Sequence, residues 1–266
     1  MPANSSATHP SGLQITFDEG PHTYQDSDSM YYTSVTTFVK RSKPEFDTDG
    51  EILKRCAARD GITPEELQRK WKHKGSQASI YGTRCHENAE FQFTKQFNKI
   101  HNPVIPKEEI AFRVIWDYVA MLQKKYTFMS CEQIVFSPRY ALAGSIDLLM
   151  RDDSQQTLWI LDWKSNERID KENKYIKPEK VEGFMLPPIA HLHDCHFVHY
   201  ALQLGTYERL IKDEGYLKAN GMEGYTIRKM LLHIPPMGEQ IIEIELPDAS
   251  REVAEMLIAK AYNIPF

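Results

Sequence analysis

The sequence predicts one α/β domain in which a mixed β-sheet is flanked by helices. Segments rich in β-branched and aromatic residues alternate with segments of helix formers, and no repeat or long linker divides the chain. A chain of 266 residues that is 41% hydrophobic and 26% charged can bury a core of the size that such a domain needs. We expect the domain to span residues 13–266, after a small polar tail over residues 1–12 that we expect to be disordered.

The first half of the chain predicts a β element followed by helices. LQITF and YYTSVTTFV flank the turn-forming stretch DEGPHTYQDSDS and predict strands with connections. Helix formers dominate residues 50–96, where Thr63 as N-cap, Pro64 and two following glutamates mark a helix start. An apolar pattern of helical period predicts another helix over residues 108–125.

The second half predicts the central sheet and the remaining helices. Three strands are expected in EQIVFSPRYALAGSIDLLMRDDSQQTLWILDWKS, with DDSQQ as the turn between the last two. A helix over residues 199–214, strands over residues 229–234 and in QIIEIEL, and a last helix over residues 249–262 are expected to follow.

Targeting segments, cysteine spacing and net charge indicate where the protein works and which partners it can have. The first twelve residues lack the features of a signal peptide and no apolar run is long enough for a membrane span, so we expect a cytoplasmic protein without a membrane partner. The four cysteines are far apart and include no C-x-x-C pair, which argues against a disulfide framework. The formal net charge of −5 neither requires nor excludes nucleic acid, because a local basic groove is compatible with it.

Ionisable side chains interrupt two apolar strands of the predicted hairpin. In GSIDLLM, strand alternation places Asp147 on the face opposite Ile146 and Leu148. In LWILDWKS the same period places Asp162 and Lys164 on one face, about 7 Å apart along the strand. Because apolar residues flank both acids, the ionised carboxylates are costly to bury without a compensating cation.

Two carboxylates on adjacent strands are suited to hold a divalent metal ion. Carboxylate oxygens, with vacancies left for water and phosphate, favour Mg²⁺ or Mn²⁺ over a closed zinc site. Such an ion polarises a phosphoryl oxygen, while Lys164 is placed to steer the attacking water or to neutralise charge that builds up on phosphorus. The alternative is structural: an ion pair between Asp162 and Lys164 beside an isolated Asp147.

Four short motifs together resemble those of the PD-(D/E)XK nuclease superfamily. GSID and DWK resemble its acidic motifs, with Ile146 in place of the proline in the superfamily's name. GTRCHENAE resembles the G-x-x-x-H helix of the RecB-like and phage-type exonuclease branch, with His86 in the metal-binding position. QLGTY resembles the Q-x-x-x-Y motif of that branch at Gln203 and Tyr207. The four motifs keep the order of the family and span residues 82–207.

The resemblance implies a restriction-endonuclease-like core and a metal-dependent DNA nuclease. It implies four metal ligands, namely Asp147, Asp162, the backbone carbonyl of Trp163 and His86. Lys164 is then expected to assist the attacking water, and Gln203 and Tyr207 are expected to face the substrate backbone or the lysine. The most specific expectation is an exonuclease that acts on DNA ends in phage-type recombination, replication or DNA processing, together with a partner protein of that pathway. The alternatives are a structure-selective endonuclease of the same superfamily and a non-catalytic DNA-binding subunit on the same scaffold.

The helix that carries His86 offers further candidates. Glu90 lies four residues after His86, on the same helix face, and is expected to orient the imidazole or to bind a metal-coordinated water. Glu87 points about 100° away and is the weaker candidate. Gly82 lies one turn before His86 and leaves room for another backbone to approach. The alternative for His86 and Glu90 is a solvated pair.

Neither a zinc site nor an iron–sulfur cluster is expected from the histidines and cysteines of the chain. HLHDCHFVHY is rich in side chains that bind zinc, but its spacing forms no ligand pairs, so we expect a linker into the next helix and no zinc site. No three cysteines gather near the C-terminus, so no iron–sulfur cluster is expected.

DNA contacts are expected from the basic region around Trp71, Lys72 and Arg84, with Trp71 available for stacking. The polar connection after Lys164 carries four more lysines that are expected to lie over DNA, namely Lys171, Lys174, Lys177 and Lys180.

Overall fold

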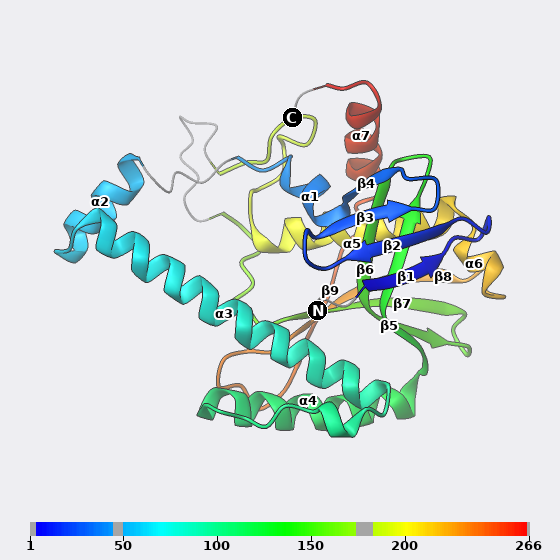
Figure 1. The fold of residues 1–266 in the computed structure, drawn as a ribbon, viewed down its shortest axis with the longest axis horizontal. Helices are drawn as coiled ribbons and strands as arrows, with labels where there is room; N and C mark the ends of the chain where they lie inside the picture. The colour runs from blue at the N-terminus through cyan, green and yellow to red at the C-terminus, as the bar shows by residue number, and fades with distance from the viewer. Residues whose placement is uncertain (1–3, 45–49, 174–182, 265–266) are drawn as a thin grey trace.

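A mixed β-sheet flanked by helices forms the protein, as the sequence predicted (Figure 1). The computed structural model describes residues 4–44, 50–173 and 183–264. Within these residues nine strands form one sheet in the order β1-β2-β3-β4-β6-β7-β8-β9, and β5 pairs with β6 off this path. The strands are β1 (Asn4–Thr8), β2 (Gln14–Asp18), β3 (Thr23–Asp26), β4 (Tyr31–Ser34), β5 (Thr127–Ser137), β6 (Leu142–Asp152), β7 (Thr157–Lys164), β8 (Thr226–His233) and β9 (Ile242–Glu245).

Helices cover both faces of the sheet. They are α1 (Val35–Lys40), α2 (Glu51–Asp60), α3 (Pro64–Phe93), the 3-10 helix η1 (Phe97–Lys99), α4 (Pro106–Lys125), α5 (His196–Asp213), α6 (Tyr216–Ala219) and α7 (Ser250–Ala261). Successive residues of β7 point to opposite faces, so Ile160 packs with α1, α5 and α7 in what we call the α5-side core. Leu161 packs with α3 and α4 in the α3-side core.

The edges of β6 position the site. Antiparallel β5 pairs with β6 from Leu142 to Arg151 and so occupies one edge along nearly its whole length. The other edge pairs in parallel with β4 at Leu142 and Ala143, and in antiparallel fashion with β7 from Leu148 onward. Between Ala143 and Leu148, no described strand pairs with that edge. We call this opening, where β4 and β7 diverge along β6, the fork.

The predicted start of α3 is confirmed. The Thr63 side chain accepts a hydrogen bond from the Glu66 backbone at 3.2 Å, and the Glu66 carboxylate accepts one from the Thr63 backbone at 3.0 Å, which forms a capping box. The first part of α3 packs against α2 through a small apolar cluster that includes Leu67. Figure 1 shows this end of α3 extending away from the sheet, while its other end lies on α4.

The expectation of a disordered tail over residues 1–12 is wrong for the part that the structure describes. β1 pairs with β2 along all of its residues. Beyond it, His9 is 6% exposed and contacts the rings of Phe136 and Tyr216. A strand with small polar side chains is stable here because the sheet ladder satisfies its backbone, and Ala7 packs against a buried cluster.

The strand expected throughout YYTSVTTFV is also wrong in part. β4 ends at Ser34 and α1 begins at Val35. The Ser34 hydroxyl accepts a hydrogen bond from the Thr37 backbone at 3.1 Å and caps the helix. Burial of Val35, Phe38 and Val39 in the α5-side core then outweighs the β propensity of this stretch.

The structure also bears on the cysteines and on membrane-spanning helices. All four cysteines are free. Among the described residues, no helix is both long enough and apolar enough to cross a membrane.

Candidate active site

Three ionisable side chains meet at the fork. His86 comes from α3, Glu132 from β5 and Asp147 from β6, and one ligand atom of each lies within 4.8 Å of the other two. His86 Nδ1 lies 3.2 Å from an oxygen of Asp147. His86 and Asp147 were predicted from the sequence, whereas Glu132 was not. In the described part of the chain, this is the one group of three or more His, Cys, Asp or Glu side chains that meets so closely.

Two glycines let neighbouring elements come close to this group. A Cβ on Gly82 of α3 would lie 2.9 Å from the hydroxyl of Ser165, which directly follows β7. A Cβ on Gly144 of β6 would lie 2.8 Å from the hydroxyl of Tyr207 on α5. Atoms at such distances clash, so a larger residue at either position would force the neighbouring side chain to shift. Both helices are thereby held against the strands that carry the acids.

Asp162 and Lys164 share one face of β7, as strand alternation predicted. They form a close ion pair in which the Asp162 side chain is 4% exposed. Lys164 Nζ also lies 4.7 Å from the centre of the Tyr200 ring. Asp162 was predicted to bind metal together with Asp147, but its carboxylate is paired with Lys164 and lies outside the group of three.

The backbone of Trp163 connects the end of β7 to the group of three. Its N–H donates a hydrogen bond to Asp147 Oδ2 at 2.9 Å, and His86 also hydrogen-bonds to the Trp163 backbone. Its side chain is buried in the α3-side core. The backbone that was predicted to supply a metal ligand therefore lies against His86 and Asp147.

Regular alternation along β6 fails at the site. Ile146 and Leu149 lie in the α5-side core, whereas Leu148 lies in the α3-side core. The prediction that Ile146 and Leu148 share a face is therefore wrong. On the neighbouring strand, Glu132 has a φ of 46°, in the left-handed region that non-glycine residues rarely adopt. The acids thus project from a locally irregular stretch of sheet, and sequence periodicity does not predict such irregularity.

Burial determines the protonation of the site. It raises the pKa of Asp147 and raises that of Asp162 to about 6, although Lys164 opposes both effects. Burial and the charge of Lys164 lower the pKa of His86 to about 4, so its imidazole is neutral at pH 7 and can offer a lone pair. Burial alone would lower the pKa of Lys164, but the charges of Asp162 and Asp147 outweigh it and raise the pKa. The lysine therefore stays charged.

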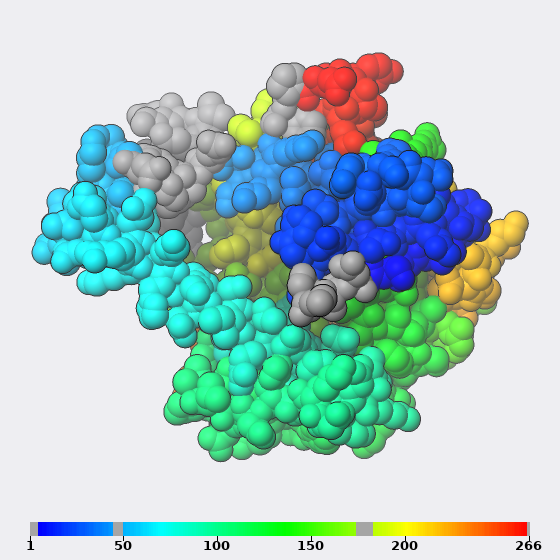
Figure 2. Space-filling model, in the orientation of Figure 1, coloured from blue at the N-terminus to red at the C-terminus, as the bar shows by residue number. Residues whose placement is uncertain are grey.

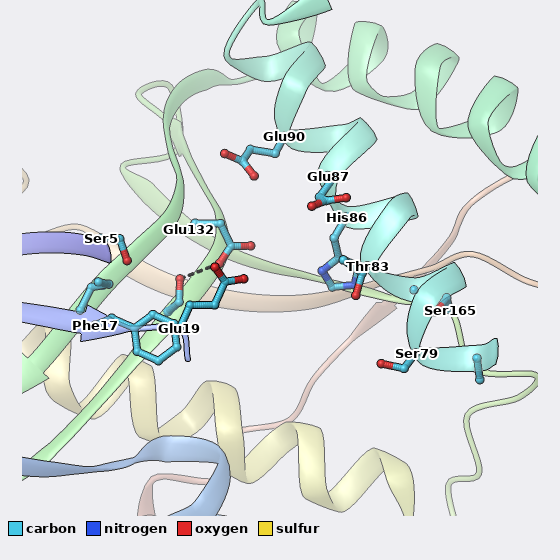
Figure 3. Close-up of a pocket in the computed structure, with 14 residues that line it drawn as sticks. Ser5, Phe17, Glu19, Ser79, Thr83, His86, Glu87, Glu90, Glu132 and Ser165 are labelled. Atoms are coloured by element: carbon cyan, nitrogen blue, oxygen red, sulfur yellow. Dashed lines mark hydrogen bonds between the residues drawn. The ribbon is translucent and has the colours of Figure 1, made fainter. Parts of the chain in front are cut away.

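A pocket of about 640 Å³ opens beside the group of three (Figure 3). His86, Glu87, Glu90 and Glu132 line it on the side of α3 and β5, and Ser5, Phe17 and Glu19 line it from the N-terminal strands. Figure 2 shows these strands, in dark blue, and α3, in cyan, on the same face of the molecule. Partial burial of its carboxyl group and the charge of Asp147 raise the pKa of Glu132, but Glu132 is an exposed residue at the pocket, so solvent weakens this effect. Such a concentration of carboxylates favours cations.

Some predicted residues lie at the pocket and others do not. Glu90 lines the pocket outside the group of three, and burial raises its pKa. Arg84, predicted to contact DNA, instead donates hydrogen bonds to Glu108 and to the Asn102 carbonyl, both at 2.6 Å, and so fixes α4 to α3. Trp71, predicted to stack on bases, packs in the cluster between α2 and α3.

Lysines predicted to contact DNA are placed unevenly. Lys72 is exposed on the first part of α3, where it remains a predicted contact. Lys171 lies over the ring of Phe197, with its Nζ 5.6 Å from the ring centre. Lys174, Lys177 and Lys180 lie outside the described residues.

Gln203 and Tyr207 lie on α5 and hydrogen-bond to each other. Tyr207 is 3% exposed and its ring packs against Gly144 of β6. A role of Tyr207 toward the substrate or toward Lys164 stays a prediction. Gln203 lines a second pocket, between α1 and α5.

The histidine-rich segment leads into α5, as predicted. His191, His196 and His199 each lie near a different carboxylate. Cys195 is the residue directly before the first turn of α5. In the described residues, the segment therefore forms no group of three or more side chains that meet closely enough to hold a metal ion.

Comparisons with known proteins leave the chain unassigned to a family. A scan against models of protein families finds no match, and a search of curated proteins finds none.

The side chains at the fork fit a hard divalent cation. Two carboxylates and one neutral imidazole suit Mn²⁺ or Mg²⁺, and none of the three is a thiolate. Without a cation, Glu132 and Asp147 repel each other, which contributes to the raised pKa of Glu132. A bound cation would remove that repulsion.

Proposed function

We propose that the protein is a divalent-metal-dependent nuclease that hydrolyses phosphodiester bonds in DNA. The observation that carries the proposal is the meeting of His86, Glu132 and Asp147 within 4.8 Å, beside a buried ion pair of Asp162 and Lys164. The resemblance of four ordered motifs to the PD-(D/E)XK superfamily supports the same chemistry.

Each side chain has a role in this proposal. His86, Glu132 and Asp147 hold the ion, which when bound acts as a Lewis acid on a phosphoryl oxygen. Lys164 keeps its positive charge and balances the negative charge that develops on the phosphate. Asp162, whose pKa is about 6, is ionised at neutral pH and fixes the ammonium of Lys164.

Nuclease activity is tested with end-labelled linear duplex DNA, the matching single strand and a covalently closed circle, each with Mg²⁺ or Mn²⁺. Chelation should abolish cleavage. Asp147→Asn should lower the rate at least about 10³-fold, because it removes a ligand and weakens the backbone link to Trp163. The matched control is Asp153→Asn, an exposed acid in the turn after β6, which should leave the rate unchanged.

The outcomes separate the alternatives. An exonuclease degrades the linear substrates and leaves the closed circle intact, whereas discrete fragments from the circle indicate an endonuclease. Cleavage at an undiminished rate in excess chelator contradicts the metal mechanism. DNA binding without cleavage under any of these metal conditions indicates a non-catalytic subunit.

A further inference from the structure

A second pocket, of about 200 Å³, lies between α1 and α5. Its lining includes Thr36, Lys40, Lys43, His199, Tyr200 and Gln203. We propose that this pocket binds a phosphate group of the nucleic-acid strand directly, without a metal ion, while the neighbouring phosphodiester is cleaved at the fork. This assignment rests on the proposed nuclease function and extends it to a second contact with the same strand.

Unpaired positive charge makes the pocket suitable for an anion. Lys40 and Lys43 form no ion pair with any described residue. Asp194 is bound to the pocket residue His199 at 2.7 Å, and this interaction, together with the charge of Lys43, keeps the pKa of Asp194 low against the effect of burial. Two lysines therefore line a small concave site to which Thr36 and Gln203 add neutral hydrogen-bond donors.

Tyr200 places this pocket next to the reacting groups. Its ring lines the pocket and lies 4.7 Å from Lys164 Nζ. Its hydroxyl donates to Asn166 Oδ1 at 2.9 Å, so the ring is fixed between the pocket and Lys164. The backbone carbonyl of Asn166 accepts a hydrogen bond from His233 at 2.8 Å, taking Nε2 as the protonated nitrogen. A phosphate in the pocket is thus one side chain away from the proposed catalytic lysine.

The two pockets differ in the way that they can hold phosphate. The pocket at the fork is lined by carboxylates and repels a phosphate unless a cation is bound. The pocket between α1 and α5 presents lysines and needs no cation. Adjacent phosphates of one strand can therefore be bound in two ways, through a cation at the fork and directly by lysines in the second pocket. Only the direct contact remains when the cation is chelated.

The test measures binding of a fluorescein-labelled twelve-residue oligothymidylate in EDTA, by anisotropy, over a range of KCl concentrations. Lys40→Gln with Lys43→Gln should weaken binding about tenfold and should reduce the slope of log K against log salt by about 0.7, since one phosphate contact on a single strand contributes about 0.7. The control variant, Lys124→Gln with Lys218→Gln, removes two exposed lysines from α4 and α6 and should leave the slope unchanged. Circular dichroism and thermal unfolding verify that all variants fold.

A kinetic readout complements binding. With Mn²⁺ present, the pocket variant should raise KM about tenfold and change kcat no more than a few-fold, because it leaves the fork intact. If the wild-type protein binds the oligonucleotide and the pocket variant binds equally well with the same slope, the assignment of the pocket is wrong while the nuclease proposal stands. If the wild-type protein neither binds nor cleaves DNA, both fail.

Discussion

Glu132 and Asp147 occupy facing positions on β5 and β6. Cys131 pairs with Leu148 and Gln133 with Ile146, so the positions between them oppose each other. The Ser145 hydroxyl donates a hydrogen bond to Glu132 at 2.7 Å and holds the carboxylate toward the fork. This arrangement makes Glu132 as important to the proposed metal site as the acids of the recognisable motifs.

Glu132→Gln should weaken Mn²⁺ binding by at least about tenfold, because the amide keeps the shape of the side chain but loses its negative charge. Isothermal titration calorimetry measures the affinity. Glu87→Gln is the matched control on the same pocket, since the Glu87 carboxylate is paired with His101 at 2.6 Å. Equal Mn²⁺ affinity of Glu132→Gln and the wild-type protein would remove Glu132 from the site.

Metal binding should release protons at mildly acidic pH. Burial raises the pKa of the proposed ligand Asp147, and burial together with the charge of Asp147 raises that of the proposed ligand Glu132 to about 7, so part of the carboxyl population is protonated at mildly acidic pH. A cation favours the ionised form and displaces these protons, so affinity should fall as the pH drops below about 7. Calorimetry at pH 6 in buffers of different ionisation enthalpy measures the release. Equal heats in all buffers would contradict it.

At the scale of single residues, the sequence reveals functional candidates where a charged residue stands among apolar neighbours. Asp147, Asp162 and Lys164 stand out because charged side chains interrupt apolar strands. Glu132 was predictable in principle, since the hairpin that pairs Ser137 with Leu142 also sets Glu132 opposite Asp147. The structural role of Arg84 was not, because its partner Glu108 is brought near only by the packing of two helices.

At the scale of elements, α3 contains two glycines, Gly75 and Gly82, whose surroundings differ. Gly82 faces Ser165 at the site, whereas a Cβ on Gly75 would meet no atom within 4 Å. Gly75→Ala should stabilise the protein by about 0.5–1 kcal/mol through helix propensity, with unchanged activity. Gly82→Ala gains the same propensity but must displace Ser165, so activity should fall about tenfold or more. Thermal unfolding and nuclease assays measure both effects, and equal activity of the two variants would contradict the role of Gly82.

Element types follow from the sequence where local signals and tertiary packing agree. The capping box at Thr63 and the turn between β6 and β7 are examples. α1 was not predicted because a stretch of β-branched residues is helical when Ser34 caps it and its apolar face is buried. β1 was not predicted because polar composition does not reveal a free sheet edge that can accept another strand.

At the scale of the whole molecule, the N-terminal strands connect distant parts of the chain. His9 lies 3.2 Å from Glu214 at the end of α5, and Ser5 lines the pocket at the fork. Deletion of residues 1–9 should therefore destabilise the protein by about 2–3 kcal/mol, or lower Tm by about 5 °C, and reduce activity. Deletion of residues 1–3 is the control. Scanning calorimetry that shows equal Tm for both deletions would indicate that β1 contributes nothing to stability.

The fork also has a consequence for how the backbone opens to solvent. In most sheets the middle of a central strand exchanges its amide hydrogens most slowly, because ladders on both sides protect it. In β6 the stretch from Gly144 to Asp147 has β5 on one side and, within the described chain, no strand on the other. Hydrogen exchange along β6 should therefore be fastest at the centre and slower toward both ends. A uniformly protected β6 would show that the fork is closed in solution.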